Sequence, residues 1–177
     1  STASQHRKKI LQTYQHLFNY LELPLPAEIG AKFEECKEME QQVLPEVKGV
    51  PYIYGNTQYD CFELNSYLCS LGLVPQLIQS NKLSEANFAD IESILAQNDP
   101  YICKAANIAP LQYVYDVLHP WFYMGHEFGE RLRRKGIALL HSDPAGKMLG
   151  FECSSFMLQA VAKAVADAKK FREEAGL

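Results

Sequence analysis

The chain has 177 residues, of which 47% are hydrophobic and 21% are charged. These fractions are typical of globular proteins and exclude intrinsic disorder and collagen-like or low-complexity scaffolds. Lysine and arginine together number 17 against 21 aspartate and glutamate residues, which gives a formal net charge of -4. That balance disfavours a general electrostatic attraction to phosphate, so we expect no nucleic-acid partner. The length is typical of one domain, and we predict a single helical domain over residues 1–177.

Cysteine usage and the absence of long apolar runs indicate the compartment. No apolar run approaches the ~20 residues that a membrane span needs, and residues 1–9 are polar with no signal-peptide core behind them. The chain has five cysteines, an odd number: Cys36, Cys61, Cys69, Cys103 and Cys153. No two of them form a CxxC pair. This pattern disfavours a disulfide scaffold and a zinc finger. We therefore expect a cytoplasmic protein with reduced thiols and no membrane span.

Helical periodicity dominates the first half of the chain. Apolar residues recur at three- and four-residue intervals in residues 6–21, 26–45 and 60–72, and in a segment that begins at Ser84. Asp60 is a good N-cap for the third of these helices, and Gly72 a good C-terminal stop. Residues 47–59 are the least helical stretch and are predicted to form a loop or a short extended piece.

The second half is also predicted to be helical. Residues 100–118 and 120–140 are interpreted as helical segments, with a kink or interruption expected at Pro110. Residues 152–174 are rich in alanine and predict a long final helix whose small residues allow close approach by another helix. With no βαβ alternation recognised, the sequence predicts an all-α domain of about six to eight helices.

Cys61 has a context that suits a nucleophile. It opens a predicted helix, where the positive end of the helix dipole lowers the pKa of a thiol. The run Gly49-Val50-Pro51-Tyr52 before Asp60-Cys61 resembles the cysteine motif of NlpC-type cell-wall peptidases, although Phe62-Glu63 stands where those enzymes have Ser-Gly. The resemblance implies a cysteine hydrolase that uses Cys61 as its catalytic residue.

A longer, discontinuous resemblance involves the second half of the chain. Asp99-Pro100-Tyr101-Ile102, followed by Pro120-Trp121-Phe122-Tyr123-Met124-Gly125, is similar to the late helices of the globin superfamily, in its sensor-globin and phycobiliprotein branches. Asp143-Pro144-Ala145-Gly146 and Cys153-Ser154-Ser155 look like the end of a phycobiliprotein β chain. The resemblance implies a globin-like helical fold, with or without a tetrapyrrole.

Haem or bilin is the cofactor that this resemblance implies. The position of a sensor globin's iron-binding histidine holds Gln112 or Tyr113, depending on the register. The expected cofactor-binding residues form an aromatic-rich slot with ligands at its edge and a covalent tether, and are Tyr113, His119, Trp121, His126 and Cys153. No separate metal site is predicted.

The sequence favours binding over catalysis. The leading hypothesis is a cytosolic, globin-like sensor or ligand-binding domain with a tetrapyrrole pocket, which signals to a protein partner or forms a homodimer through its C-terminal helix. Two alternatives stay open. The chain is either a cofactor-free protein–protein interaction module or a cysteine hydrolase of the NlpC-like type that uses Cys61.

Overall fold

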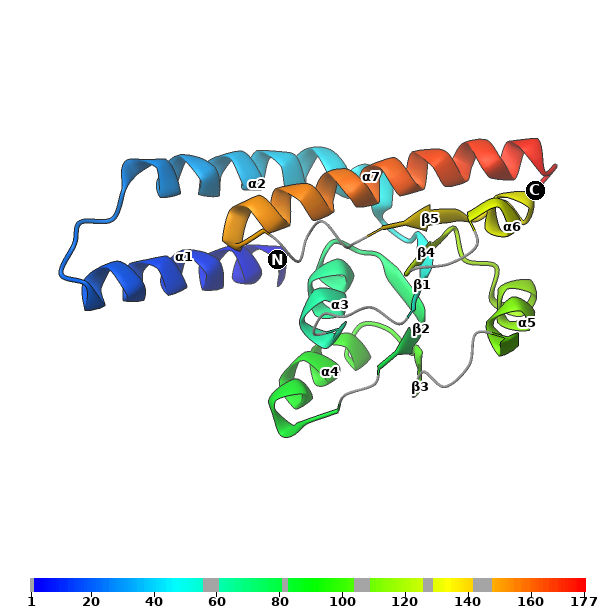
Figure 1. Ribbon diagram of the computed structural model, residues 1–177, viewed down its shortest axis with the longest axis horizontal. Coiled ribbons are helices and arrows are strands. Elements are labelled where there is room, and N and C mark those ends of the chain that lie inside the picture. Colours follow the sequence, from blue (N-terminus) through cyan, green and yellow to red (C-terminus); the bar gives the residue numbers. More distant parts are fainter. Residues whose placement is uncertain (1, 56–60, 81–82, 104–108, 126–128, 142–147) are drawn as a thin grey trace.

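The computed structural model describes the backbone of residues 2–55, 61–80, 83–103, 109–125, 129–141 and 148–177. Side chains are described within these ranges, except those of residues 2–5, 61, 109–113 and 129. The described chain forms one parallel sheet with helices on both faces (Figure 1).

The sheet has five strands in the order β3-β2-β1-β4-β5, and each neighbouring pair is parallel. The strands are β1 (Pro51–Tyr54), β2 (Val74–Gln79), β3 (Tyr101–Cys103), β4 (Phe122–Met124) and β5 (Ala138–Leu140). The prediction of an all-α, globin-like fold is therefore wrong. The strands escaped prediction because they are only three to six residues long. The central strands are also buried on both faces, so their sequences lack the alternation of polar and apolar residues that marks a half-exposed strand.

Most of the predicted helices are confirmed. The helices are α1 (Thr2–Tyr20), α2 (Ala27–Val47), α3 (Cys61–Ser70), α4 (Phe88–Leu95), α5 (Ala109–Leu118), α6 (Gly129–Arg134) and α7 (Gly150–Glu174), with a 3-10 turn, η1 (Glu85–Asn87), before α4. Residues 100–118 and 120–140 are not helical throughout, since each of these segments also contains strand. Among the described helices, none has the length and hydropathy to cross a membrane.

Each face of the sheet packs against its own set of helices. On one face, strand residues such as Tyr52 and Phe122, whose rings stack at 5.2 Å, join a core with α2, α3, α4 and α7. On the other face, Ile53 and Tyr123 pack against α5 and α6. The small residues of α7, Ala164 and Ala168, are buried in the first core. The apolar face of the C-terminal helix is thus used within the chain.

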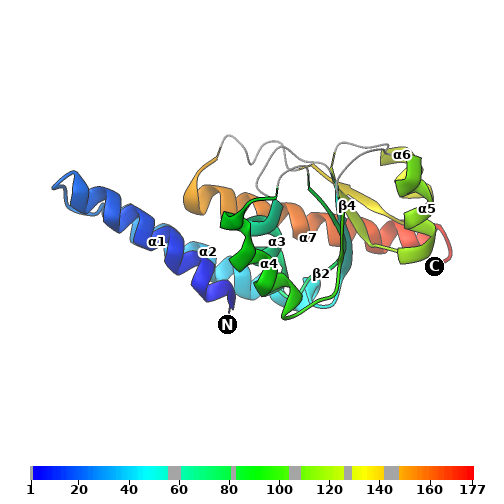
Figure 2. The same cartoon turned by 90° about the horizontal axis from the view of Figure 1, so that it is seen from below.

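The first two helices extend beyond the sheet. Figures 1 and 2 show α1 and α2 as an antiparallel hairpin whose turn lies far from the strands, while α7 runs along α2. The base of the hairpin contacts α3 and α7. Its direction is therefore set by α3 at its base and by α7 along α2.

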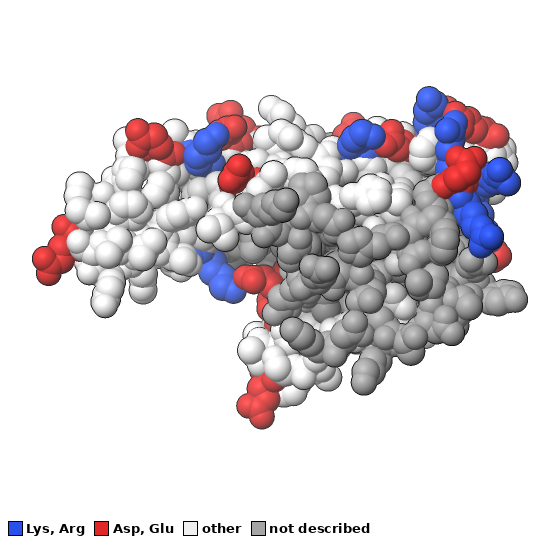
Figure 3. Space-filling model, viewed as in Figure 1, with Lys and Arg blue, Asp and Glu red and all other residues white. Residues whose placement is uncertain are grey.

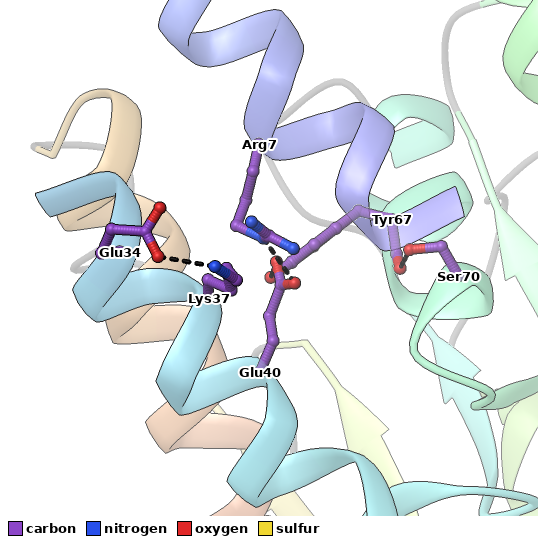
Figure 4. A network of polar contacts seen from close by, with 6 residues as sticks. All are labelled: Arg7, Glu34, Lys37, Glu40, Tyr67 and Ser70. Carbon is purple, nitrogen blue, oxygen red and sulfur yellow. Dashed lines mark hydrogen bonds and ion pairs between the residues drawn. The ribbon is translucent and has the colours of Figure 1, made fainter. Parts of the chain in front are cut away.

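A buried polar network fixes that base (Figure 4). The Arg7 guanidinium on α1 donates from Nε to Glu40 Oε2 on α2 at 2.6 Å, and the side chains are only 8% and 3% exposed. Tyr67 on α3 donates its hydroxyl to Glu40 Oε1 at 3.2 Å. Burial raises the pKa of the Glu40 carboxyl, against the opposing effects of Arg7 and Tyr67. Three helices therefore meet at one carboxylate.

Removing one partner of this network should destabilise the protein strongly. Arg7→Met leaves the Glu40 carboxylate buried without its cation, and such a loss costs about 3–5 kcal/mol in the free energy of unfolding. The double variant Arg7→Met, Glu40→Met should recover most of that loss, because no buried charge is left unpaired. Urea denaturation followed by circular dichroism measures both. A double variant no more stable than Arg7→Met would contradict this account.

Candidate ligand-binding edge of the sheet

The chain reverses its direction of travel across the sheet at β1. From β1 it passes through α3 to β2 and through α4 to β3, then returns through α5 to β4 and through α6 to β5. The strands β1 and β4, which pair in parallel, therefore send their following helices to opposite faces. In open α/β sheets the crevice outside the carboxyl ends of two such strands is the usual ligand site.

A glycine directly follows each of the two strands at this reversal. Gly55 follows β1 and donates its backbone N–H to the Met124 carbonyl at 2.7 Å, while Gly125 follows β4 and donates to the Leu140 carbonyl at 3.3 Å. The Tyr123 ring lies against both glycines, so that a Cβ at Gly125 would stand 2.7 Å from the tyrosine Cζ, and a Cβ at Gly55 would overlap the hydroxyl. Tyr123 is 2% exposed and meets the Tyr115 ring edge-on at 5.7 Å. The Tyr123 side chain therefore occupies the space beside both glycines, at the carboxyl ends of β1 and β4.

Gly55, Tyr123 and Gly125 are not among the site residues predicted from the sequence. The available signal was that two short apolar runs, 51–54 and 122–124, are each followed by glycine. Such a run bounded by glycine is consistent with a buried strand.

The predicted cofactor residues are distributed over different parts of the fold. His119 is exposed, has a backbone φ of 51°, and precedes the amino end of β4. Trp121 is half-buried beside the same end, with the Arg172 guanidinium 5.4 Å above its ring centroid. His126 comes after the carboxyl end of β4 and lies outside the described residues, as does the side chain of Tyr113 on α5. His119 and His126 are thus separated by the whole of β4.

Cys153 lies in α7, half-buried against the core of the first face. Desolvation by burial raises the pKa of its thiol, and the nearby Glu152 carboxylate adds to the rise. Its role as a covalent tether stays a prediction.

The other described thiols with shifted pKa values are also held protonated. Burial raises the pKa of Cys36 to about 11 and that of Cys69 to about 12. Within the described part of the chain, no group of three or more His, Cys, Asp or Glu side chains could hold a metal ion. Cys61 begins α3, as predicted, and its side chain is outside the described residues.

Comparison with solved structures finds this fold in a nitrogenase chain, described as "Nitrogenase Cp1 at pH 6.5". The TM-score is 0.68 at 10% sequence identity, and the match covers 88% of this chain. The chain spans 37% of the length of that nitrogenase chain. No protein-family model and no curated protein matches the sequence. The likeness shows an α/β fold with a parallel sheet, so the resemblance to the globin superfamily, in its sensor-globin and phycobiliprotein branches, is wrong.

Adding a methyl group at Gly55 tests the packing of Tyr123 at the strand ends. Gly55→Ala should lower the free energy of unfolding by about 1–3 kcal/mol, because the new Cβ overlaps the Tyr123 ring. Gly30→Ala on α2 is the matched control, since nothing lies within 4 Å of its added Cβ. That control should stabilise the protein by about 0.5–1 kcal/mol. Equal effects of the two substitutions in thermal unfolding would refute the packing argument.

Thiol reactivity should follow burial. At pH 8, iodoacetamide should alkylate Cys36 and Cys69 slowly, because burial raises both pKa values. Cys61 should react first if its position at the start of α3 lowers its pKa, as the sequence predicts. Mass spectrometry of tryptic peptides gives the order, and slower alkylation of Cys61 than of Cys69 would end the hydrolase hypothesis.

Proposed function

We propose that this domain binds a small polar ligand at the carboxyl edge of its sheet, between β1 and β4. The observation that carries the proposal is the reversal of strand order at β1, which puts the two following helices on opposite faces. Open α/β sheets bind ligands at such points. The proposal keeps the ligand-binding role expected from the sequence and moves its location from a helical pocket to the edge of a sheet.

Backbone at Gly55 and Gly125 supports a close approach by the ligand. Neither residue has a Cβ, and the atoms nearest to such a Cβ belong to Tyr123, which packs on the face covered by α5 and α6. The N–H groups of both glycines already donate to the Met124 and Leu140 carbonyls. A ligand at these strand ends would therefore meet backbone that carries no side chain of its own and no free N–H donor.

Residues near this edge favour a ligand smaller than a dinucleotide. The six residues from Gly55, Gly-Asn-Thr-Gln-Tyr-Asp, lack the second and third glycines of the dinucleotide fingerprint. Cys61 at the start of α3 and the exposed His141 after β5 are residue types that bind transition metals. A transition-metal ion is therefore one of the ligands to test.

Three probes distinguish the hypotheses: cobalt(II), ADP and haemin. In ¹H–¹⁵N spectra, cobalt(II) or ADP should perturb the amides of Gly55 and Gly125 and leave those of Leu17 and Leu21, far along the hairpin, unchanged. His141→Asn should weaken cobalt(II) binding about tenfold, whereas His119→Asn, at the opposite end of the strands, should not change it. Asparagine suits the control because it tolerates the positive φ of His119.

Two results would count against the proposal. The first is binding of cobalt(II) or ADP with perturbed amides away from Gly55 and Gly125, and the second is no perturbation by either probe. Binding of haemin beside His119 and Trp121 would instead support the tetrapyrrole pocket predicted from the sequence.

A further inference from the structure

The α1–α2 hairpin is only partly covered by α7. Helix α7 runs along α2 and begins at Gly150, whereas the hairpin continues beyond that point to its turn at residues 21–26, as Figures 1 and 2 show. The same two helices that hold the start of α7 therefore extend past it without a covering element among the described residues.

Aromatic side chains pack together at the point where α7 begins to cover the hairpin. Phe151, in the first turn of α7, stacks on Tyr14 of α1 at 6.0 Å and meets Phe33 of α2 edge-on at 5.9 Å. Gly150 has a φ of 56°, and a Cβ there would overlap the Tyr14 hydroxyl. A helix start is thus seated against aromatic side chains from both arms of the hairpin.

An open groove of about 610 Å³ lies at this place. Its apolar lining comes from α1, α2 and the start of α7, and includes Tyr14, Ile29, Leu149 and Phe156. Further along the hairpin the exposed fractions are 49% for Leu17, 86% for Tyr20 and 50% for Leu21, and Leu149 is 80% exposed. Apolar side chains therefore continue from the groove to the hairpin turn, which is the pattern of an interaction surface.

The charges at this groove are mainly acidic. Glu35 pairs with Lys32 at 2.7 Å. Glu28 on α2 and Glu152 on α7 also line the groove, and no cation among the described residues pairs with either carboxylate. Figure 3 shows the free end of the hairpin largely without lysine or arginine, and residues 10–31 contain neither. A bound partner with lysine or arginine would supply cations for the Glu28 and Glu152 carboxylates.

We propose that this groove binds an amphipathic helix of a partner protein, with an apolar face flanked by lysine or arginine. The occupant is a helix because the hairpin already holds one, α7, in line with the groove, and because helices bind apolar grooves through residues at i, i+3, i+4 and i+7. It is basic because Glu28 and Glu152 line the groove from two different helices, α2 and α7. The proposal is independent of the ligand site at the sheet edge.

A second copy of this chain fits the groove less well. Two hairpins joined through their free ends would bring together surfaces that carry Glu22 and Glu28 and no cation between residues 10 and 31. Two of the three Lys and Arg residues at the start of α1 are already engaged, since Arg7 pairs with Glu40 and Lys9 with Glu63. Like charges placed opposite each other oppose association.

The test uses two fluorescein-labelled peptides of about 18 residues, or five helical turns. Both have leucine at i, i+3, i+4 and i+7 positions, and the flanking residues are lysine in one peptide and glutamate in the other. Fluorescence anisotropy with the whole chain should show at least tenfold tighter binding of the lysine peptide. The double variant Glu28→Lys, Glu152→Lys should reverse that preference, and both positions are exposed, so folding should be unchanged by circular dichroism.

The double variant Glu92→Lys, Glu173→Lys, at exposed positions on α4 and at the far end of α7, is the matched control for the change in net charge, and it should leave the preference for the lysine peptide intact. Leu21→Ser at the hairpin turn should weaken binding of the lysine peptide several-fold. The proposal is overturned if the two peptides bind equally, if neither binds, or if the Glu92→Lys, Glu173→Lys variant has the same effect as the charge reversal in the groove. It is also overturned if sedimentation shows a dimer that the lysine peptide does not dissociate.

Discussion

Burial of the short central strands on both faces is the constraint on which the rest of this structure depends. Strands of three to six residues make few ladder hydrogen bonds, so they are stable only when helices cover both sides of the sheet. Tyr52, Ile53 and Tyr54 are all fully buried, although successive side chains point to opposite faces. Two sets of helices are therefore required, and the crossing of the chain from one set to the other creates the reversal at β1.

The same burial explains what could be predicted from the sequence. The long helices α1, α2 and α7 have a solvent face, so their apolar residues show the 3.6-residue period. β4 has none, because Phe122, Tyr123 and Met124 are all buried, and a run of three apolar residues has no period that separates strand from helix. The segment 120–140 was therefore predicted as helix, although it contains β4, α6 and β5. Helices with a solvent-exposed face could therefore be predicted from the sequence, and the fully buried strands at the centre of the fold could not.

The candidate site was hard to predict for a related reason. Its location follows from the order of the strands, and strand order is a property of the whole chain rather than of any motif. Cys61 was singled out correctly as the start of a helix, but nothing local to residues 49–61 indicates that β4 lies beside β1. The aromatic cluster at 119–126 was interpreted as a pocket wall, whereas the strand within it separates His119 from His126.

The buried ion pair of Arg7 and Glu40 connects the sheet to the free end of the hairpin. Apolar contacts at the base would hold α1 and α2 together at many relative rotations, because dispersion and hydrophobic forces are not directional. The carboxylate of Glu40 accepts from Arg7 on α1 and from Tyr67 on α3, so it fixes one rotation of the hairpin relative to the sheet. Such a pair adds little net stability, because the cost of desolvating both charges offsets their attraction. In this arrangement Tyr14 of α1 and Ile29 of α2 line the groove together with the start of α7.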